Sequence, residues 1–263
     1  MTKTRVSLAD LVLPDEFNFL VSKSEIYDSS SSPEAKVYYL KTDGGYYLKR
    51  GVAGSLAAEA KMAEYFHTLN LSPRVLSYAT KDGFDWLLSE ECHGEDLTAS
   101  MYLENPKKLC DTLAETLRTL HEKSHTHCPI KDRTASYFLS AERGYKSGKF
   151  DRFLFEGSTF AYDTPREAWD VFTTGKELLN GHVLLHGDYC LPNLIFDKWN
   201  FSGFIDLGAA GVGDRHVDIF WGMWTLNFNL KSNKYCKRFL DCYGRELINM
   251  DALRTVAAAE CFG

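Results

Sequence analysis

The sequence lacks several features that would place the protein in a special structural class. Its seven cysteines are odd in number and contain no Cys-x-x-Cys pair, which argues against a disulfide framework or a zinc knuckle and predicts reduced, mostly buried thiols. No apolar run is long enough to cross a bilayer, and the N-terminal stretch has no apolar segment followed by a small-residue cleavage site. We therefore expect a cytoplasmic protein with no membrane partner.

The sequence also has fewer positive than negative side chains, and it lacks the common phosphate-binding glycine motifs. The chain has 30 Lys and Arg against 36 Asp and Glu, a net charge of −6, which argues against a nucleic-acid partner and fits a cationic ligand better. Neither Gly-x-Gly-x-x-Gly nor Gly-x-x-x-x-Gly-Lys-Ser/Thr occurs. The absence of both motifs removes the Rossmann fingerprint and the Walker A loop as support for nucleotide binding.

The most informative stretch is residues 183–207, VLLHGDYCLPNLIFDKWNFSGFIDL. Its apolar and polar runs predict a strand over Val183–Leu185, then an irregular polar loop, then a hairpin with arms Leu194–Phe196 and Phe201–Ile205. A strand, a loop and a hairpin in this order can bring polar side chains from the loop and from the end of the hairpin close together.

Three oxygen-bearing side chains of this stretch suit phosphoryl transfer. Asp188 follows the strand, Asn193 comes five residues later, and Asp206 ends the hairpin. Phosphoryl transfer needs a carboxylate that orients a hydroxyl nucleophile and hard oxygen ligands for magnesium. The first role fits Asp188 and the second fits Asn193 and Asp206. The alternative for each residue alone is a buried Asp or Asn that bonds to loop amides.

The N-terminal half contains a lysine and a glutamate that predict an ion pair. Strands over Val37–Leu40 and Tyr46–Leu48 form a predicted hairpin that ends in Lys49, and a helix follows over Ser55–Leu69. Glu59 lies on the apolar face of that helix. Because an unpaired carboxylate on a core-facing stripe is costly, we expect it to pair with Lys49.

A competing motif lies at residues 121–125, HEKSH, which fits the His-Glu-x-x-His pattern of zinc metallopeptidases. The leucine stripe of the preceding helix stops at Leu120, no obvious third ligand follows, and Pro129 ends the segment. A metal role for this motif is therefore the weaker interpretation.

The motifs together resemble those of a known enzyme family. HGDYCLPN (186–193) with GFIDLG (203–208) is similar to the catalytic loop and metal-binding aspartate of protein-kinase-like enzymes, with Gly and Leu in place of the usual Arg and Phe. LRTLHEKSHTHCP (117–129) and GVGDRH (211–216) narrow the resemblance to aminoglycoside 3′-phosphotransferases. The resemblance is weakest over residues 131–180.

This resemblance implies an α+β, two-lobed, protein-kinase-like fold. Residues 1–93 would form a small antiparallel-sheet lobe that binds nucleotide, and residues 94–263 a larger, mainly helical lobe that holds the catalytic and acceptor sites. ATP would lie between the lobes with Mg²⁺. The implied activity is phosphorylation of the 3′-hydroxyl of kanamycin- and neomycin-type aminoglycosides, which gives antibiotic resistance.

The family also implies a role for individual residues. Asp188 would be catalytic, and Asn193 and Asp206 would bind magnesium. The residues implied for the nucleotide are Lys49, held by Glu59, together with Ser32 of a serine-rich loop and Tyr47 at the adenine-stacking position. The residues implied for the aminoglycoside are Asp188, Glu156, Glu260 and Phe262. Asp218 would brace the catalytic loop through its backbone.

Other functions remain open at this point. One is a kinase of the same fold that acts on another small-molecule hydroxyl, such as choline, a sugar or homoserine. A second is a nucleotide-binding protein without catalysis, which is disfavoured because the set Lys49, Asp188, Asn193 and Asp206 is intact. The metallopeptidase is the third.

Overall fold

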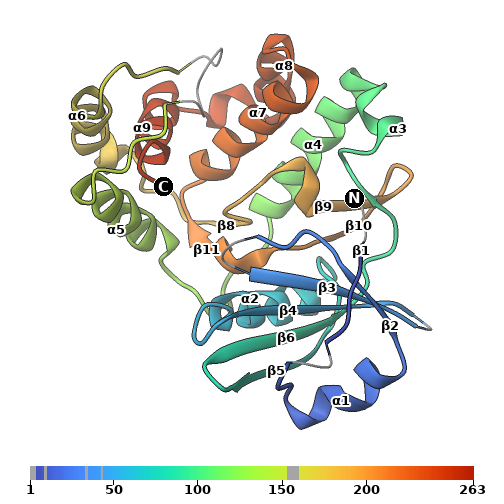
Figure 1. Ribbon diagram of the computed structural model, residues 1–263. Coiled ribbons are helices and arrows are strands. Elements are labelled where there is room, and N and C mark those ends of the chain that lie inside the picture. The colour runs from blue at the N-terminus through green and yellow to red at the C-terminus, as the bar shows by residue number, and fades with distance from the viewer. Residues whose placement is uncertain (1–3, 9–10, 33–34, 43, 153–159) are drawn as a thin grey trace. The chain divides into compact units, whose positions relative to one another are not determined.

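The chain divides into two compact units. The computed structural model describes residues 4–8, 11–32, 35–42, 44–152 and 160–263 (Figure 1). The first unit comprises residues 1–94 with 202–208, and the second comprises residues 95–201 with 209–263. The segment 202–208 therefore returns to the first unit, which a single boundary along the sequence does not describe.

A six-stranded antiparallel sheet forms the centre of the first unit, with strand order β1-β2-β3-β4-β6-β5. Both faces of the sheet are covered, because neighbouring residues of one strand are buried in different apolar clusters, Trp86 and Leu88 in one and Leu87 in the other. The strands are β1 (Thr4–Arg5), β2 (Glu25–Asp28), β3 (Ala35–Lys41), β4 (Tyr46–Val52), β5 (Val75–Lys81) and β6 (Phe84–Glu90). The hairpin predicted before Lys49 is thus confirmed as β3 and β4, although β4 continues three residues beyond Lys49.

Two helices pack on this sheet. Helix α1 (Asp15–Ser22) contributes Phe17 to an apolar cluster with Leu40, Leu48 and Trp86. Helix α2 (Ala57–Thr68) buries Glu59, Ala60, Met62 and Phe66 along one face. This is the face that the sequence pattern predicted, and it places the Glu59 carboxylate on the sheet side of the helix.

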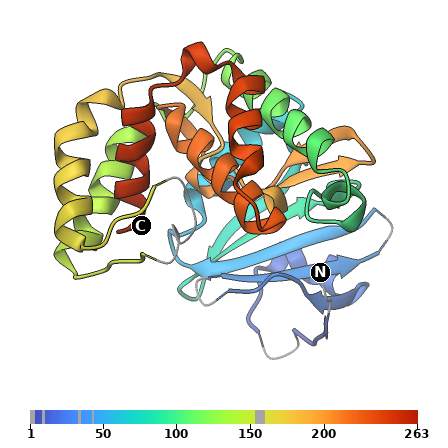
Figure 2. The same ribbon diagram turned by 90° about the horizontal axis from the view of Figure 1, so that it is seen from above.

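Helices dominate the second unit. They are α3 (Ser100–Leu103), α4 (Pro106–His121), α5 (Arg133–Lys146), α6 (Pro165–Gly175), α7 (His216–Leu230), α8 (Lys234–Tyr243) and α9 (Met250–Glu260). Short 3₁₀ turns lie at Lys176–Leu178, Leu191–Asn193, Leu207–Ala209 and Arg245–Leu247. Helix α7 packs against α8 and α9, and α9 also packs against α5 and α6. Figure 2 shows α5, α6 and α9 side by side.

Short strands carry the motif-bearing loops. They are β7 (Glu95–Asp96), β8 (Val183–Leu185), β9 (Leu194–Asp197), β10 (Asn200–Phe204) and β11 (Gly211–Gly213). Strand β8 pairs with β11, and β9 lies between β7 and β10. The predicted strand and hairpin of residues 183–205 are therefore confirmed to within one residue at most ends.

Helix α5 is the main element that the sequence did not predict. Its glycine, Gly144, reads as a helix breaker, yet it lies inside the helix and is buried. A Cβ at this position would lie 1.8 Å from the carbonyl oxygen of Phe262. The glycine therefore serves close packing of the C-terminal segment against α5, at a moderate cost in helix propensity.

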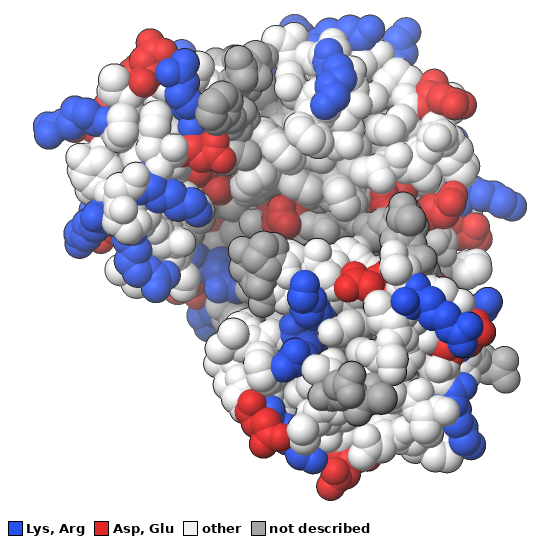
Figure 3. Space-filling model, viewed as in Figure 1, with Lys and Arg blue, Asp and Glu red and all other residues white. Residues whose placement is uncertain are grey.

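No helix in the described part of the chain is both long and apolar enough to cross a membrane. All seven cysteines are free, and five of them are buried, which confirms that the cysteines are mostly buried. Positive and negative side chains are interspersed over the face shown in Figure 3.

Candidate active site

Lys49 of β4 and Glu59 of α2 form the expected ion pair within the first unit. Lys49 Nζ donates to Glu59 Oε2 at 2.8 Å and to Oε1 at 3.0 Å. The side chains are 19% and 11% exposed. Burial alone would lower the pKa of Lys49, but the neighbouring carboxylates of Glu59 and Asp206 outweigh it and raise that pKa. Lys49 is therefore a fixed positive charge at neutral pH.

Asp206 also pairs with the Lys49 ammonium. It forms an ion pair with Lys49 Nζ while its own side chain stays half-exposed. Its φ of +63° lies in the left-handed region, where Asp is better tolerated than most residues. The preceding strand holds it in this unit, because Phe204 N donates to Leu71 O at 2.7 Å and the Phe204 ring packs edge-on against Phe66.

The loop after β8 is held in place by one buried aspartate of α7. Asp218 is fully buried and accepts the N–H groups of His186 at 2.8 Å and Gly187 at 2.7 Å. The bracing role that the resemblance implied for Asp218 is thus present in the structure. Gly187 has a φ of +85°, and a Cβ there would lie 2.0 Å from the carbonyl oxygen of Ala209, so this position requires glycine.

His121 belongs to the same network and is not arranged as a zinc ligand. Its Nε2 lies 3.1 Å from Asp218 Oδ2, and its Nδ1 lies 2.8 Å from the Tyr243 hydroxyl. Both ring nitrogens are therefore occupied. Within the described ranges, no three His, Cys, Asp or Glu side chains are grouped so as to hold a metal ion. His121 is therefore a structural residue at the C-terminal end of α4.

Asn193 and Asp188 are in direct contact within the second unit. The Asn193 amide nitrogen donates to the Asp188 backbone oxygen and to Asp188 Oδ2, each at 2.9 Å. These bonds fix the amide orientation and hold the Asp188 carboxylate. The amide oxygen of Asn193 accepts no hydrogen bond from the residues that the structure describes, so it can serve as a hard ligand for a divalent cation.

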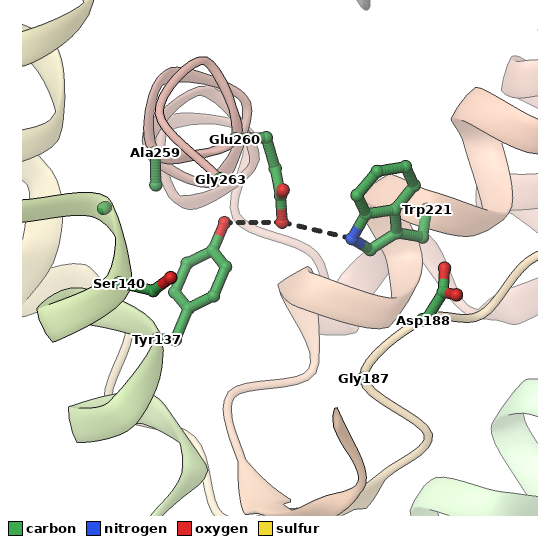
Figure 4. A pocket seen from close by; sticks show the side chains of 9 residues that line it. Tyr137, Ser140, Gly187, Asp188, Trp221, Ala259, Glu260 and Gly263 are labelled. Atoms are coloured by element: carbon green, nitrogen blue, oxygen red, sulfur yellow. Dashed lines mark hydrogen bonds between the residues drawn. The ribbon is translucent and has the colours of Figure 1, made fainter. Parts of the chain in front are cut away.

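A pocket with a volume of about 200 Å³ lies beside Asp188 in the second unit. Figure 4 shows Asp188 on one side of it and Glu260, from the end of α9, on the other. The residues that line it are Tyr137, Ser140, Ala141, Gly187, Asp188, Trp221, Ala259, Glu260 and Gly263. Two carboxyl groups thus face one small, largely apolar cavity, which suits a ligand with a hydroxyl and amines.

Glu260 is held by two neutral donors. Glu260 Oε1 accepts the Tyr137 hydroxyl at 3.0 Å and the Trp221 indole N–H at 3.1 Å (Figure 4). Burial raises the pKa of Glu260 to about 7, although the two hydrogen bonds pull it down. A carboxyl group with this pKa changes charge near neutral pH.

Two other residues predicted for the ligands, Phe262 and Tyr47, are not among the residues that line the pocket. The Phe262 side chain is 1% exposed and packs edge-on against Tyr145 and Trp169, so its ring faces the core instead of the pocket. Glu156 lies outside the described residues. Tyr47 lies on β4, with its ring 5.2 Å from that of Tyr39.

The serine-rich loop accepts hydrogen bonds from the start of β3. Ser32 Oγ accepts the Ala35 N–H, and Ser31 Oγ accepts the Val37 N–H, each at 3.1 Å. These bonds close the turn between β2 and β3. A contact between Ser32 and a nucleotide stays a prediction.

Among the pocket residues that sequence reasoning missed are three with a hydrogen-bonding side chain, Tyr137, Ser140 and Trp221. The first two lie on α5, whose existence the pattern did not reveal. Trp221 lies on α7, which is apolar on nearly all sides. In such a helix a tryptophan that donates a hydrogen bond cannot be told from its apolar neighbours by sequence.

Residues 30–255 match the model of the family described as "Phosphotransferase enzyme family". The chain belongs to this family. It is 45% identical over 250 residues to a probable aminoglycoside 3′-phosphotransferase of Lactococcus lactis, covering 95% of each chain. It is 33% identical over 183 residues to an aminoglycoside 3′-phosphotransferase of Niallia circulans, covering 69% of each.

Solved structures of this phosphotransferase family have the same fold. An aminoglycoside 3′-phosphotransferase of type VIII aligns with a TM-score of 0.72 at 23% identity, covering 90% of this chain and 91% of the other. An aminoglycoside phosphotransferase of Streptomyces rimosus, in complex with ADP and streptomycin, aligns with a TM-score of 0.72 at 21% identity, covering 94% and 97%. These alignments confirm the predicted α+β, protein-kinase-like fold.

Proposed function

We propose that this phosphotransferase moves the γ-phosphate of ATP to the 3′-hydroxyl of aminoglycosides of the kanamycin and neomycin type and thereby gives resistance to them. The observation that carries the proposal is the pocket that Asp188 and Glu260 both line. An aminoglycoside presents hydroxyl and ammonium groups together, and two carboxyl groups in one cavity complement both. The relative with 45% identity supports the same acceptor and regiochemistry.

Asp188 is the group that would act on the acceptor hydroxyl. Its carboxylate is held by Asn193 at 2.9 Å and opens into the pocket, so it can accept the hydroxyl proton and keep the oxygen lone pair directed at the phosphorus. Because the transition state of phosphoryl transfer is loose, positioning contributes more than proton abstraction.

Lys49, Asn193 and Asp206 would serve the nucleotide and its metal. The Lys49 ammonium, fixed by Glu59, would contact the α- and β-phosphates. The Asn193 amide oxygen and the Asp206 carboxylate are hard oxygen donors of the type that Mg²⁺ takes. When bound, Mg²⁺ would neutralise charge that develops on the phosphate oxygens. Ser32 and Tyr47 stay candidates for contacts to the phosphates and the adenine.

The test is phosphorylation of defined acceptors. The protein is incubated with magnesium-ATP and kanamycin, neomycin or a gentamicin compound that lacks the 3′-hydroxyl. The mass of each acceptor is then measured by mass spectrometry. Kanamycin and neomycin should gain one phosphate, and the 3′-deoxy compound should gain none. Choline and homoserine arms test the other acceptors of this fold. Modification of the 3′-deoxy compound would overturn the regiochemistry, and ATP consumption with choline or homoserine alone would overturn the acceptor class.

The Asp188→Asn variant provides the catalytic control. It keeps the side-chain shape but removes the charge, and we expect kcat to fall by about a hundredfold or more while the fold is kept. Circular dichroism and thermal unfolding check the fold. A variant with most of the wild-type kcat would remove Asp188 from its proposed role.

A further inference from the structure

Helix α7 carries two buried polar side chains on one of its faces. Asp218 and Thr225 are both 0% exposed, and their separation of seven positions is close to two full turns of an α-helix. Asp218 holds the start of the loop at residues 186–193 through two backbone N–H groups. Thr225 bonds to the other end of this loop, because its Oγ1 accepts the Leu191 N–H at 3.1 Å.

The Leu191 N–H needs an acceptor from outside its own turn. Leu191 begins the 3₁₀ turn Leu191–Asn193 and is 0% exposed, and the first N–H groups of a helical turn have no partner within that turn. The next residue, Pro192, has no N–H, and Asn193 N donates to the Cys190 carbonyl oxygen at 2.9 Å. Thr225 therefore supplies the acceptor for a buried donor that would be costly to leave unpaired.

Asn229, one turn further along α7, fixes the Thr225 hydroxyl. Asn229 Nδ2 donates to the Thr225 carbonyl oxygen at 2.8 Å and to Thr225 Oγ1 at 3.2 Å. A hydroxyl oxygen has two acceptor lone pairs, and here they receive the Leu191 N–H and the Asn229 amide. The hydroxyl proton therefore points away from both donors, and Oγ1 stays directed at Leu191.

The turn that Thr225 holds ends in Asn193. The Asn193 amide nitrogen donates to the backbone oxygen and to the carboxylate of Asp188, each at 2.9 Å, and its amide oxygen is the donor proposed for magnesium. A turn of three residues has few hydrogen bonds of its own, so its orientation depends on contacts with neighbouring elements. A rotation of this turn would move the amide oxygen and the Asp188 carboxylate together.

We propose that Thr225, supported by Asn229, is a positioning residue for Asn193. Its bond to Leu191 sets the orientation of the 3₁₀ turn, and thereby the contribution of magnesium to nucleotide binding and the direction of the Asp188 carboxylate. Asp218 and Thr225 thus hold one end of the loop each. The inference rests on the proposed function for the roles of Asn193 and Asp188, and Thr225 itself does not line the pocket.

Three variants separate the hydrogen bond from packing. Thr225→Val keeps the shape and removes the acceptor, whereas Thr225→Ser keeps the acceptor and removes one methyl group. Thr255→Val is the matched control, because Thr255 is 1% exposed in α9 and its hydroxyl donates to the Asp251 carbonyl oxygen of its own helix at 2.8 Å. Circular dichroism and thermal unfolding verify that each variant folds.

The first measurement is hydrogen exchange of the Leu191 amide by ¹⁵N NMR in the free protein. The exchange rate is divided by that of Leu117, a fully buried residue of α4, which cancels a change in global stability. Thr225→Val should raise this ratio about tenfold or more, and Thr225→Ser and Thr255→Val should keep it within about threefold of the wild type. An unchanged ratio in Thr225→Val would overturn the proposal.

The second measurement is the Kd of a non-hydrolysable ATP analogue by titration calorimetry, with saturating magnesium and with a chelator. The ratio of the two Kd values is the gain in affinity from magnesium. Thr225→Val should reduce this gain about tenfold, and Thr225→Ser and Thr255→Val should keep it within about threefold of the wild type. A Thr225 that only stabilises the fold would lower the Tm of Thr225→Val without changing the gain, and that result would overturn the positioning role.

The double variant Asn193→Ala/Thr225→Val tests whether Thr225 acts through Asn193. Asn193→Ala alone should remove most of the gain in affinity from magnesium. Thr225→Val should then lower the remaining gain by no more than about twofold, because residues that act in one chain of contacts are not additive. Losses that multiply independently would overturn the action through Asn193.

Steady-state kinetics with kanamycin provide the third readout. The kcat of Thr225→Val should fall about tenfold while the kanamycin KM stays within about threefold of the wild type, and Thr225→Ser should regain most of the kcat. A wild-type protein that phosphorylates no aminoglycoside would overturn the proposed acceptor. A Leu191 exchange ratio and a magnesium gain that do not respond to Thr225→Val would instead overturn the role of Thr225.

Discussion

Gly187 shows how a single residue controls the shape of the loop that carries Asp188. Its φ of +85° is strained for any residue with a Cβ, and the Ala209 carbonyl oxygen occupies the space that a Cβ would need. We expect Gly187→Ala to lower the free energy of unfolding by about 2–4 kcal/mol and to reduce kcat by roughly a hundredfold, because Asp188 is displaced. Urea unfolding and steady-state kinetics measure the two effects.

Gly148 provides the matched control for that variant. It also has a positive φ, of +78°, but a Cβ there would have no atom within 4 Å. Gly148→Ala should therefore cost only about 1 kcal/mol and leave kcat close to that of the wild type. Equal losses of kcat in the two variants would show that the Ala209 contact is not what matters.

Glu260 makes stability depend on pH in a direction opposite to that of most carboxyl groups. Its pKa rises from 4.5 to about 7 on folding, so the folded state binds more protons than the unfolded state between these values. The stability that this proton provides is complete below about pH 4.5 and is lost as pH rises through about 7.

Glu260→Gln should therefore become more stable than the wild type as pH rises from 6 to 8. The amide oxygen can still accept from Tyr137 and Trp221, and no charge has to be buried. The difference should grow by about 1.3 kcal/mol between pH 6 and pH 8 and by about 3 kcal/mol from pH 4.5 to pH 8, and thermal melts of both proteins from pH 4.5 to pH 8 measure it. A stability difference between Glu260→Gln and the wild type that is the same at pH 6 and pH 8 would contradict the raised pKa.

At the scale of whole elements, the first turn of α7 holds the loop that carries Asp188. Asp218 accepts two backbone N–H groups from that loop and contacts His121. Asp218→Asn places an amide N–H against backbone donors, so we expect a loss of about 3 kcal/mol and a fall in kcat. The exposed Asp251 in the first turn of α9 is the control, and Asp251→Asn should stay within about 0.5 kcal/mol. Similar losses in both would contradict the special role of Asp218.

The elements that the sequence predicted well are those with a clear period or a clear turn. Strands β3 and β4 flank a glycine turn, and α2 has an apolar face with one carboxylate on it, so the Lys49–Glu59 pair could be predicted before the structure was known. Helix α5 could not, because Gly144 interrupts its pattern for a reason that lies more than a hundred residues away, in the backbone of Phe262.

The same contrast explains the site. Asp188 and Asn193 lie five residues apart in one loop, so their contact is local and their order in the chain is enough to predict it. The Glu260 environment combines α5, α7 and α9, and no local pattern records that Tyr137 and Trp221 meet there. The sequence therefore indicated Glu260 only through the family resemblance. It did not predict the hydrogen-bond partners of Glu260 or its raised pKa.

At the scale of the whole molecule, nucleotide binding should stabilise the fold. At a nucleotide concentration one hundred times the Kd, magnesium-ATP should add about 2.7 kcal/mol to the free energy of unfolding. Lys49→Met removes the proposed phosphate contact, so the same concentration should stabilise that variant far less. Lys61→Met changes an exposed lysine of α2 and should keep the full gain. Differential scanning calorimetry with and without nucleotide measures all three proteins, and an equal gain in Lys49→Met would contradict the assignment.

The path of the chain through the two units limits how such enzymes can be recombined. Residues 202–208 belong to the first unit but are encoded between two parts of the second, and Phe204 is anchored there by Leu71 and Phe66. A chimaera made by one crossover near residue 94 would therefore combine the sheet of one parent with residues 202–208, the end of β10 and the residues after it, from the other. Exchange of the intact first unit between homologous genes needs two further junctions, on either side of that seven-residue segment.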